Sequence, residues 1–249
     1  MNLIKFPRTL SRLLNVRRGD NRLDMTLVVG FEDDISSLNE LAVEILGPLE
    51  AKYYASLRFE RRQWSYLLGR YTAKLALKQL LPETDFRSIE IVKGVFEQPV
   101  VLCNRSPGWS VTISHAESRA VALAYPTEHP MGIDIERIDS THQRTILSQL
   151  SSEETKWAES GADCGYRLAP ALWAAKEALS KALTTGLMSP IEVYSLVEFR
   201  LIDSGIWEGL FLNFAQYKAW VWTGSSYALS IAMPRRSMLY GHRGLCAIL

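Results

Sequence analysis

Short apolar runs alternate along the chain with long segments of helical periodicity. The β-branched run 25–30 ends at Gly30 and predicts a strand. From 56 to 81 apolar positions recur every three or four residues, and Pro82 follows, so a helix is expected there. Four further apolar runs, separated by turn-forming residues, predict a small antiparallel sheet: 89–93, 100–102, 110–114 and 120–125.

The second half of the chain shows a similar order of patterns. A strand is expected at 132–138, followed by helices at 151–160 and 170–183. The segment from 191 to about 232 is rich in Val, Tyr, Trp and Phe, which predicts strands. The order of strand, helix and strands in each half suggests two similar halves that meet near 126–132.

One internal match supports two similar halves. Segment 69–77 resembles segment 176–183 in its lysine and in its small and apolar positions, with Lys74 set opposite Lys181. Short segments reach such a match by chance, so the residues alone leave duplication open.

Composition limits the class of protein. A chain of 249 residues with 47% hydrophobic content can bury a core as one large domain or two small ones. The formal net charge of +1 provides no global attraction to nucleic acid or membrane. Cys103, Cys164 and Cys246 are odd in number and far apart, which argues against a disulfide framework or a zinc site.

The N-terminal segment carries no secretory pattern, and no apolar run reaches the ~18 residues of a membrane span, so the cytoplasm is the expected location. Up to Arg22 the chain mixes leucines with basic residues. An amphipathic basic helix could form there, or the segment is a solvated or packed leader.

The first candidate for chemistry is the strand that contains Ile133, Asp134, Ile135 and Glu136. Strict alternation sends the two isoleucines to one face and the two carboxylates to the other. Like charges on one face repel each other, and a divalent cation between them relieves the repulsion. The alternative is a solvent-facing polar side on an edge strand.

The second candidate is the helix at 170–183. Its apolar stripe predicts a core face, while Trp173, Glu177 and Lys181 lie at i, i+4 and i+8 on the opposite side. A tryptophan beside charges suggests that this second side is also covered. The alternative is a surface Glu177–Lys181 pair that contributes only ~0.2–0.5 kcal/mol.

Two other polar groups could contact an anion. Ser114 and His115 end a strand, but adjacent strand residues point apart, so they do not form a nucleophilic pair. Basic side chains also line the first long helix, where they form a solvated face or bind phosphate: Arg58, Arg61, Arg62, Arg70, Lys74 and Lys78.

Together these motifs resemble the ordered signature of 4'-phosphopantetheinyl transferases of the larger, two-lobed class. The signature consists of Ser114-His115, then the segment 132–136, then Trp173-x-x-Lys176-Glu177-Ala178-x-x-Lys181. The resemblance covers about 55–187. It implies an α+β fold of two similar lobes related by a pseudo-twofold axis, each with a small, mainly antiparallel sheet and a long helix. The implied lobes are 1–130, on the 3'-phosphate side of the coenzyme, and 131–249, on the metal and pyrophosphate side. Two lobes that form their own cleft would permit a monomer, which is the expected state.

The resemblance also implies roles for residues. Asp134, Glu136 and Glu177 match the ligands of Mg²⁺, and Glu177, Lys181 and Asp134 match the catalytic group. Lys181, assisted by Lys176, matches a contact to the pyrophosphate. Contacts to the rest of coenzyme A are implied for Arg61, Lys93, Ser114 and His115.

The implied reaction transfers the 4'-phosphopantetheine arm of coenzyme A to a serine of an acyl or peptidyl carrier protein and releases 3',5'-adenosine bisphosphate. Activation of a carrier in secondary metabolism is the expected setting. A non-catalytic binder of carrier and coenzyme, or a Mg²⁺-dependent phosphohydrolase, are the alternatives. The sequence departs from the family at Glu97-Gln98-Pro99, where the family often has Gly-Lys-Pro.

Overall fold

The structure is a computed structural model, and its residue contacts divide the chain into two compact units. The first unit comprises 1–15 and 22–128, and the second comprises 16–21 and 129–249. Each unit is described by itself below. The residues that the structure describes are 6–32, 38–82, 84–103, 108–141, 143–160 and 165–249.

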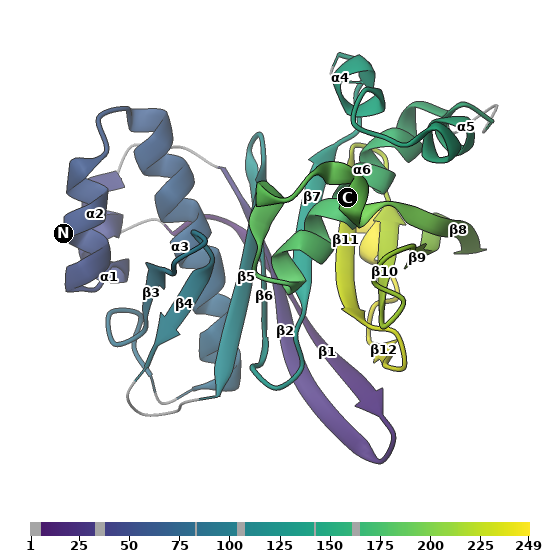
Figure 1. Ribbon diagram of the computed structural model, residues 1–249. Coiled ribbons are helices and arrows are strands. Elements are labelled where there is room, and N and C mark those ends of the chain that lie inside the picture. The colour runs from purple at the N-terminus through teal and green to yellow at the C-terminus, as the bar shows by residue number, and fades with distance from the viewer. Residues whose placement is uncertain (1–5, 33–37, 83, 104–107, 142, 161–164) are drawn as a thin grey trace. The chain divides into compact units, whose positions relative to one another are not determined.

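The first unit packs a long helix, α3 (Glu60–Leu80), against strands β5 (Trp109–Ala116) and β6 (Arg119–Pro126) (Figure 1). The sheet of this unit has the strand order β1-β2-β6-β5, with β1 (Thr9–Arg18) and β2 (Asn21–Phe31), whereas β12 (Met238–Tyr240) belongs to the second unit. The remaining elements are α1 (Leu38–Ile45), α2 (Pro48–Ser56), β3 (Glu90–Lys93) and β4 (Pro99–Leu102). Strands β3 and β4 pair as a separate two-stranded sheet.

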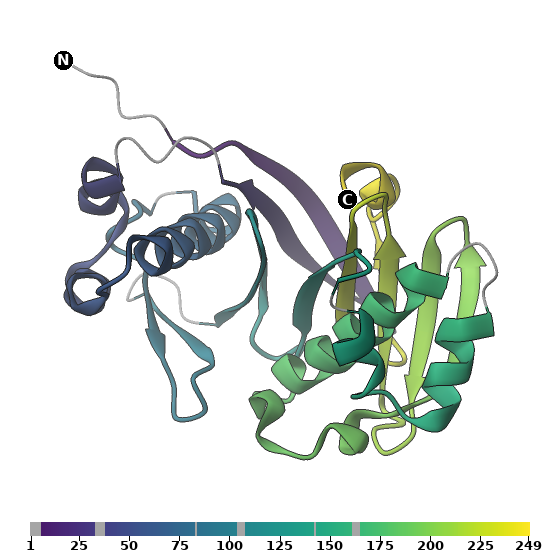
Figure 2. The same cartoon turned by 90° about the horizontal axis from the view of Figure 1, so that it is seen from above.

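The second unit packs α6 (Gly165–Ala182) across its own antiparallel sheet, which has the order β7-β11-β10-β9-β8 (Figure 2). The strands are β7 (Gly132–Arg137), β8 (Leu196–Asp203), β9 (Ile206–Phe211), β10 (Tyr217–Thr223) and β11 (Tyr227–Pro234). The helices α4 (Gln143–Leu147) and α5 (Ser152–Ser160) precede α6, and three 3₁₀ turns lie at Gly186–Met188, Ile191–Tyr194 and Leu245–Ile248.

The two units repeat one order of elements. The series from β2 through three helices to β6 has the same sequence of elements as the series from β7 through three helices to β11. The strand orders also agree, since β2-β6-β5 corresponds to β7-β11-β10. The expected α+β fold of two similar halves is therefore confirmed, while their pseudo-twofold relation stays a prediction.

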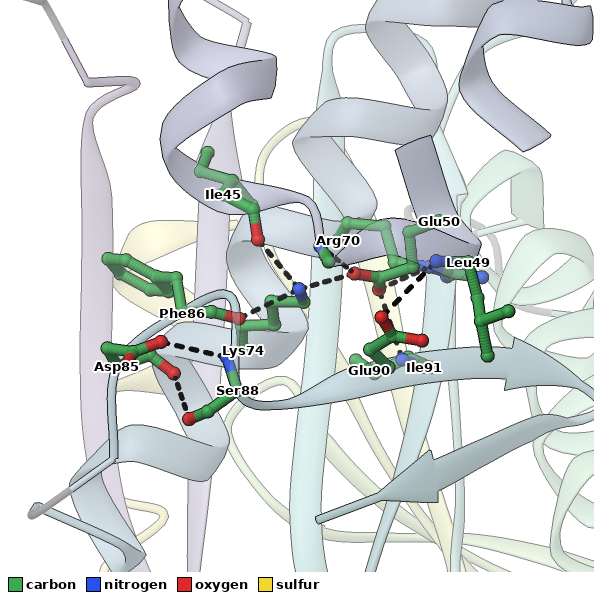
Figure 3. A network of polar contacts seen from close by, with 11 residues as sticks. Ile45, Leu49, Glu50, Arg70, Lys74, Asp85, Phe86, Ser88, Glu90 and Ile91 are labelled. Atoms are coloured by element: carbon green, nitrogen blue, oxygen red, sulfur yellow. Dashed lines mark hydrogen bonds and ion pairs between the residues drawn. The ribbon is translucent and has the colours of Figure 1, made fainter. Parts of the chain in front are cut away.

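A buried ion pair joins three elements of the first unit. The ammonium of Lys74, on α3, pairs with the carboxylate of Glu50, on α2, and both side chains are buried (Figure 3). Lys74 also donates to the carbonyl oxygens of Ile45 at 2.7 Å and Phe86 at 2.9 Å. Glu50 accepts from the backbone N–H of Ile91, on β3, at 3.1 Å. Burial lowers the pKa of Lys74, and the Glu50 charge opposes that shift.

The second unit contains the same arrangement. Lys176, on α6, pairs with Glu154, on α5, at 2.6 Å, and both side chains are 0% exposed. Glu154 accepts from the backbone N–H of Leu196, on β8, at 2.8 Å. Its other oxygen accepts a hydrogen bond from the backbone N–H of Ser151 at 2.7 Å and so caps the N-terminus of α5. Glu50 caps the N-terminus of α2 in the same way, through the backbone N–H of Gly47 at 3.1 Å.

These matching contacts correct the internal alignment. Lys74 is equivalent to Lys176, not to Lys181, so Ala73-Lys74-x-Ala76-Leu77 corresponds to Ala175-Lys176-x-Ala178-Leu179. The sequence match alone was misplaced because lysines and small residues recur closely in both helices.

Several local predictions were also wrong. The described part of the basic N-terminal segment is a strand, because Leu14 and Val16 are buried with the two-residue period of a sheet. The helix predicted at 56–81 is confirmed as α3, but it begins at Glu60, because the preceding helix α2 ends at Ser56. Helix α6 begins before Pro170 and keeps that proline inside. None of the helices in the described ranges has the length and apolar character that a membrane crossing requires.

We expect the buried pair to be essential for the second unit. Lys176→Met leaves the Glu154 carboxylate buried without its counter-charge, and the free energy of unfolding should fall by about 3–5 kcal/mol. Urea denaturation monitored by tryptophan fluorescence measures this loss. Lys156→Met removes an exposed lysine of α5 that pairs with Glu153, and it should change the stability by less than about 0.5 kcal/mol. Equal losses in the two variants would contradict the assignment.

Candidate active site

The site in the second unit depends on a close approach between β7 and α6 at Gly132. A Cβ at this position would lie 1.9 Å from the carbonyl oxygen of Ala178 and 2.5 Å from the backbone nitrogen of Ala182. Only glycine permits this contact. The helical turn that contains Glu177 and Lys181 is thereby held against the strand that carries Asp134.

Helix α6 is buried on almost every side. Between Leu168 and Ala182, the half-exposed side chains are Trp173, Glu177 and Lys181, at the predicted spacing of four residues. This pattern agrees with the expectation that the second side of the helix is largely covered. The alternative, a fully exposed surface pair of Glu177 and Lys181, is therefore wrong.

Lys181 links a carboxylate of the strand to a carboxylate of the helix. Its Nζ atom lies 2.6 Å from Asp134 Oδ1 and 3.9 Å from Glu177 Oε2. The Asp134 side chain is 2% exposed, whereas those of Lys181 and Glu177 are 24% and 22% exposed. The site is therefore closed at Asp134 and open at Glu177.

Glu136, two residues after Asp134 on β7, belongs to the same electrostatic cluster. Burial raises the pKa of Glu136 to about 8, and the charges of Asp134 and Glu177 add to the shift, while Lys181 and a hydrogen bond from Trp173 oppose it. Burial, with the charge of Asp134, likewise raises the pKa of Glu177 to about 7, against the opposing effect of Lys181. The three carboxylates are thus close enough to repel one another.

The chemistry of this cluster fits a hard divalent cation. All three acidic groups offer oxygen ligands, which Mg²⁺ prefers. In the arrangement seen here, a positive group already lies among them, namely the ammonium of Lys181. Accordingly, within the described residues, no three His, Cys, Asp or Glu side chains are set around one point as a finished metal site. The metal role of Asp134, Glu136 and Glu177 stays a prediction.

Lys176, predicted to contact the coenzyme, has a different environment. Its ammonium is held by Glu154 in the interior and donates to the carbonyl oxygen of Gln149 at 3.4 Å. Lys176 is therefore not part of the cluster around Lys181. The periodicity of the helix could not reveal this, because the partner lies 22 positions earlier in the chain, on α5.

In the first unit, Ser114 and His115 lie on β5, as the sequence predicted for a strand end. Ser114 is buried and His115 is exposed. The imidazole of His115 lies against α3 at Gly69, where a Cβ would come within 2.5 Å of its Nε2 atom. Gly69 therefore makes room for this ring.

A pocket of about 120 Å³ lies in the first unit beside the buried Glu50. Its wall is mainly apolar and also contains two cations and two phenol rings. The guanidinium of Arg70 lies over the ring of Tyr66 at 4.6 Å, and the Lys93 ammonium lies 5.1 Å from the ring centre of Tyr53. The lining residues are Leu49, Glu50, Tyr53, Tyr66, Arg70, Ile91, Val92 and Lys93.

Of the two predicted basic contacts in this unit, the structure places only Lys93 at the pocket. Arg61 is an exposed residue near the start of α3 and does not line it. Arg70, two and a half turns further along the helix, does. The sequence showed a basic stripe on this helix, but it did not indicate which member faces the pocket, because α2 was not recognised as its opposite wall.

The turn that departs from the family pattern has an unusual backbone. Glu97 has φ of 62°, a left-handed conformation that glycine adopts without strain. The family's glycine falls at this position. The Glu97 carboxylate forms an ion pair with Lys93 and raises the pKa of that lysine. The replacement therefore affects both the backbone and the charge available at the pocket.

Comparison with known proteins agrees with the resemblance. Residues 130–232 match the family model described as ACPS, the 4'-phosphopantetheinyl transferase superfamily. The second unit is therefore similar to that superfamily over most of its length. A chain of 249 residues with this domain in its second half is consistent with the larger, two-lobed class.

Two solved structures are similar to parts of the chain. One is a holo-(acyl-carrier-protein) synthase from Bacillus anthracis str. Ames, in complex with CoA (3',5'-ADP), with 19% identity and a TM-score of 0.36 over 47% of this chain and 96% of that one. The other is the Thermotoga maritima holo-[acyl-carrier-protein] synthase, with 19% identity and a TM-score of 0.33 over 55% and 74% of the two chains. The comparison with curated proteins gave no match.

We expect Gly132→Ala to disrupt the contact between α6 and β7. The added methyl group meets backbone atoms that cannot move aside, so the free energy of unfolding should fall by about 2–3 kcal/mol. Gly209→Ala, in the same sheet, meets the flexible end of Leu196 and should cost clearly less. Thermal unfolding of the purified variants measures both effects. A milder effect at Gly132 than at Gly209 would argue against the close approach.

Proposed function

We propose that this protein transfers the 4'-phosphopantetheine arm of coenzyme A to a serine of an acyl or peptidyl carrier protein, with Mg²⁺ as cofactor. The observation that carries the proposal is the convergence of Asp134, Glu136, Glu177 and Lys181 from β7 and α6. The superfamily match over 130–232 supports the same reaction class.

In the proposed reaction, the serine oxygen of the carrier forms a bond to the β-phosphorus of coenzyme A. The bond from that phosphorus to the bridging oxygen breaks, and 3',5'-adenosine bisphosphate leaves. When bound by Asp134, Glu136 and Glu177, Mg²⁺ supplies positive charge that stabilises the phosphate oxygens.

The exposure of each side chain in the cluster indicates its role in the proposed reaction. Glu177 is the open carboxylate, so it is the group that takes the proton from the serine hydroxyl. Lys181 is also open to solvent, and its ammonium offsets negative charge on the pyrophosphate. Asp134 is buried and has a holding role.

The first unit has separate candidate contacts to coenzyme A. The pocket beside Glu50 supplies a guanidinium and an ammonium, from Arg70 and Lys93, together with two phenol rings. The guanidinium of Arg70 is already paired with Glu50 at 3.4 Å, so Lys93 and the two phenol rings are the proposed contacts to a phosphate attached to an aromatic base. Ser114 and His115 are further candidate contacts in this unit.

Glu177→Gln tests the proposed role of the open carboxylate. Without a base for the serine proton, the rate of carrier loading should fall by about 10²–10⁴-fold. Mass spectrometry of a carrier protein incubated with coenzyme A and Mg²⁺ detects the added arm. Glu153→Gln, which removes an exposed carboxylate of α5, is the matched control and should load carrier at the normal rate.

Loading at the normal rate by Glu177→Gln would reject this role for Glu177. A wild-type protein that binds coenzyme A but leaves the carrier unmodified would reject the transferase function. Cleavage of coenzyme A with no arm on the carrier would instead identify a phosphohydrolase.

Glu97→Gly should improve the use of coenzyme A. The change removes backbone strain of about 1 kcal/mol and frees Lys93 from its ion pair. We expect the KM for coenzyme A to fall about threefold, which is the scale of an exposed ion pair, with little change in kcat. Steady-state kinetics measure both constants. Glu97→Gln keeps the strain but removes the charge, so an unchanged KM in both variants would exclude Lys93 from coenzyme binding.

A further inference from the structure

The ammonium of Lys181 pairs with a buried acid and is also accessible to solvent. It lies 2.6 Å from Asp134, the most buried acid of the cluster, yet its own side chain is 24% exposed. A lysine in a permanent internal pair, such as Lys176 with Glu154, is 0% exposed in this protein. Lys181 is therefore held at one end by a buried acid, and it retains access to solvent.

We propose that Lys181 is an internal competitor of the divalent cation: its ammonium and the metal are alternative partners of Asp134. This inference rests on the proposed function, because it concerns the metal of that reaction. A divalent ion that binds Asp134 replaces the lysine, and the ammonium then moves to an anionic group of the substrate.

The physical reason is electrostatic. Two cations that approach one buried carboxylate repel each other strongly where solvent is largely excluded. The conformation in which Lys181 pairs with Asp134 therefore does not accept the metal. The apparent metal affinity is proportional to the fraction of molecules in which Lys181 is not paired with Asp134.

The competition also couples the metal to the substrate. A diphosphate offers the displaced ammonium a new partner, so coenzyme A should tighten Mg²⁺ binding, and Mg²⁺ should tighten coenzyme binding by the same factor. The internal pair thus disfavours loading of the metal without the substrate. This coupling needs Lys181 and disappears when its charge is removed.

The test measures Mg²⁺ binding without any carrier protein. Isothermal titration calorimetry with Mg²⁺ alone should show that Lys181→Met binds the metal about tenfold more tightly than the wild type. Lys156→Met, which removes one exposed positive charge from the same unit, should bind Mg²⁺ within about twofold of the wild type and so controls for net charge. Repeating the titration with saturating coenzyme A should tighten Mg²⁺ binding in the wild type and hardly in Lys181→Met.

Equal or weaker Mg²⁺ binding by Lys181→Met would overturn the proposal. A second measurement uses the wild-type protein, in case the variant does not fold. The lysine side-chain ¹⁵N resonance of Lys181 should shift on addition of Mg²⁺, and an unchanged resonance at saturating metal would also overturn it. Because no carrier is present, either result is independent of whether the protein transfers the arm.

Discussion

The close contact between α6 and β7 at Gly132 is the constraint on which the site depends. Without a side chain at Gly132, the backbone of the helix reaches the strand, and one turn of α6 faces the acids of β7. Charged groups from two elements about 40 residues apart then share one small volume. Burial, and after it the repulsion between the acids, raises the pKa of Glu136 and Glu177, and both effects result from this packing.

The surroundings of α6 explain how so charged a site can persist. The helix is anchored on its other sides by small and apolar residues and by the interior pair of Lys176 with Glu154. That pair also fixes the start of α5 and the first residue of β8. The helix is thus held in place by contacts that do not involve Glu177 or Lys181.

The sequence predicted the parts of the site that follow from periodicity. Alternation along β7 and four-residue steps along α6 placed Asp134 and Glu177 on defined faces, and the structure brings those faces together. Contacts between elements distant in sequence could not be predicted from periodicity. The partner of Lys176, the pocket-facing position of Arg70 and the strand nature of the N-terminal segment all depend on elements distant in sequence. The helix predicted at 151–160 is confirmed as α5, and the local capping pattern Ser151-x-x-Glu154 stabilises its start.

The repeated architecture has a consequence for how this chain can diversify. Both halves retain the same interior lysine and the same helix-capping glutamate, whereas the position of Glu177 is occupied by Leu75 in the other half. The shared scaffold tolerates very different chemistry at the neighbouring helical position. A charged cluster can therefore be present in one half while the other half has an apolar side chain at the same position.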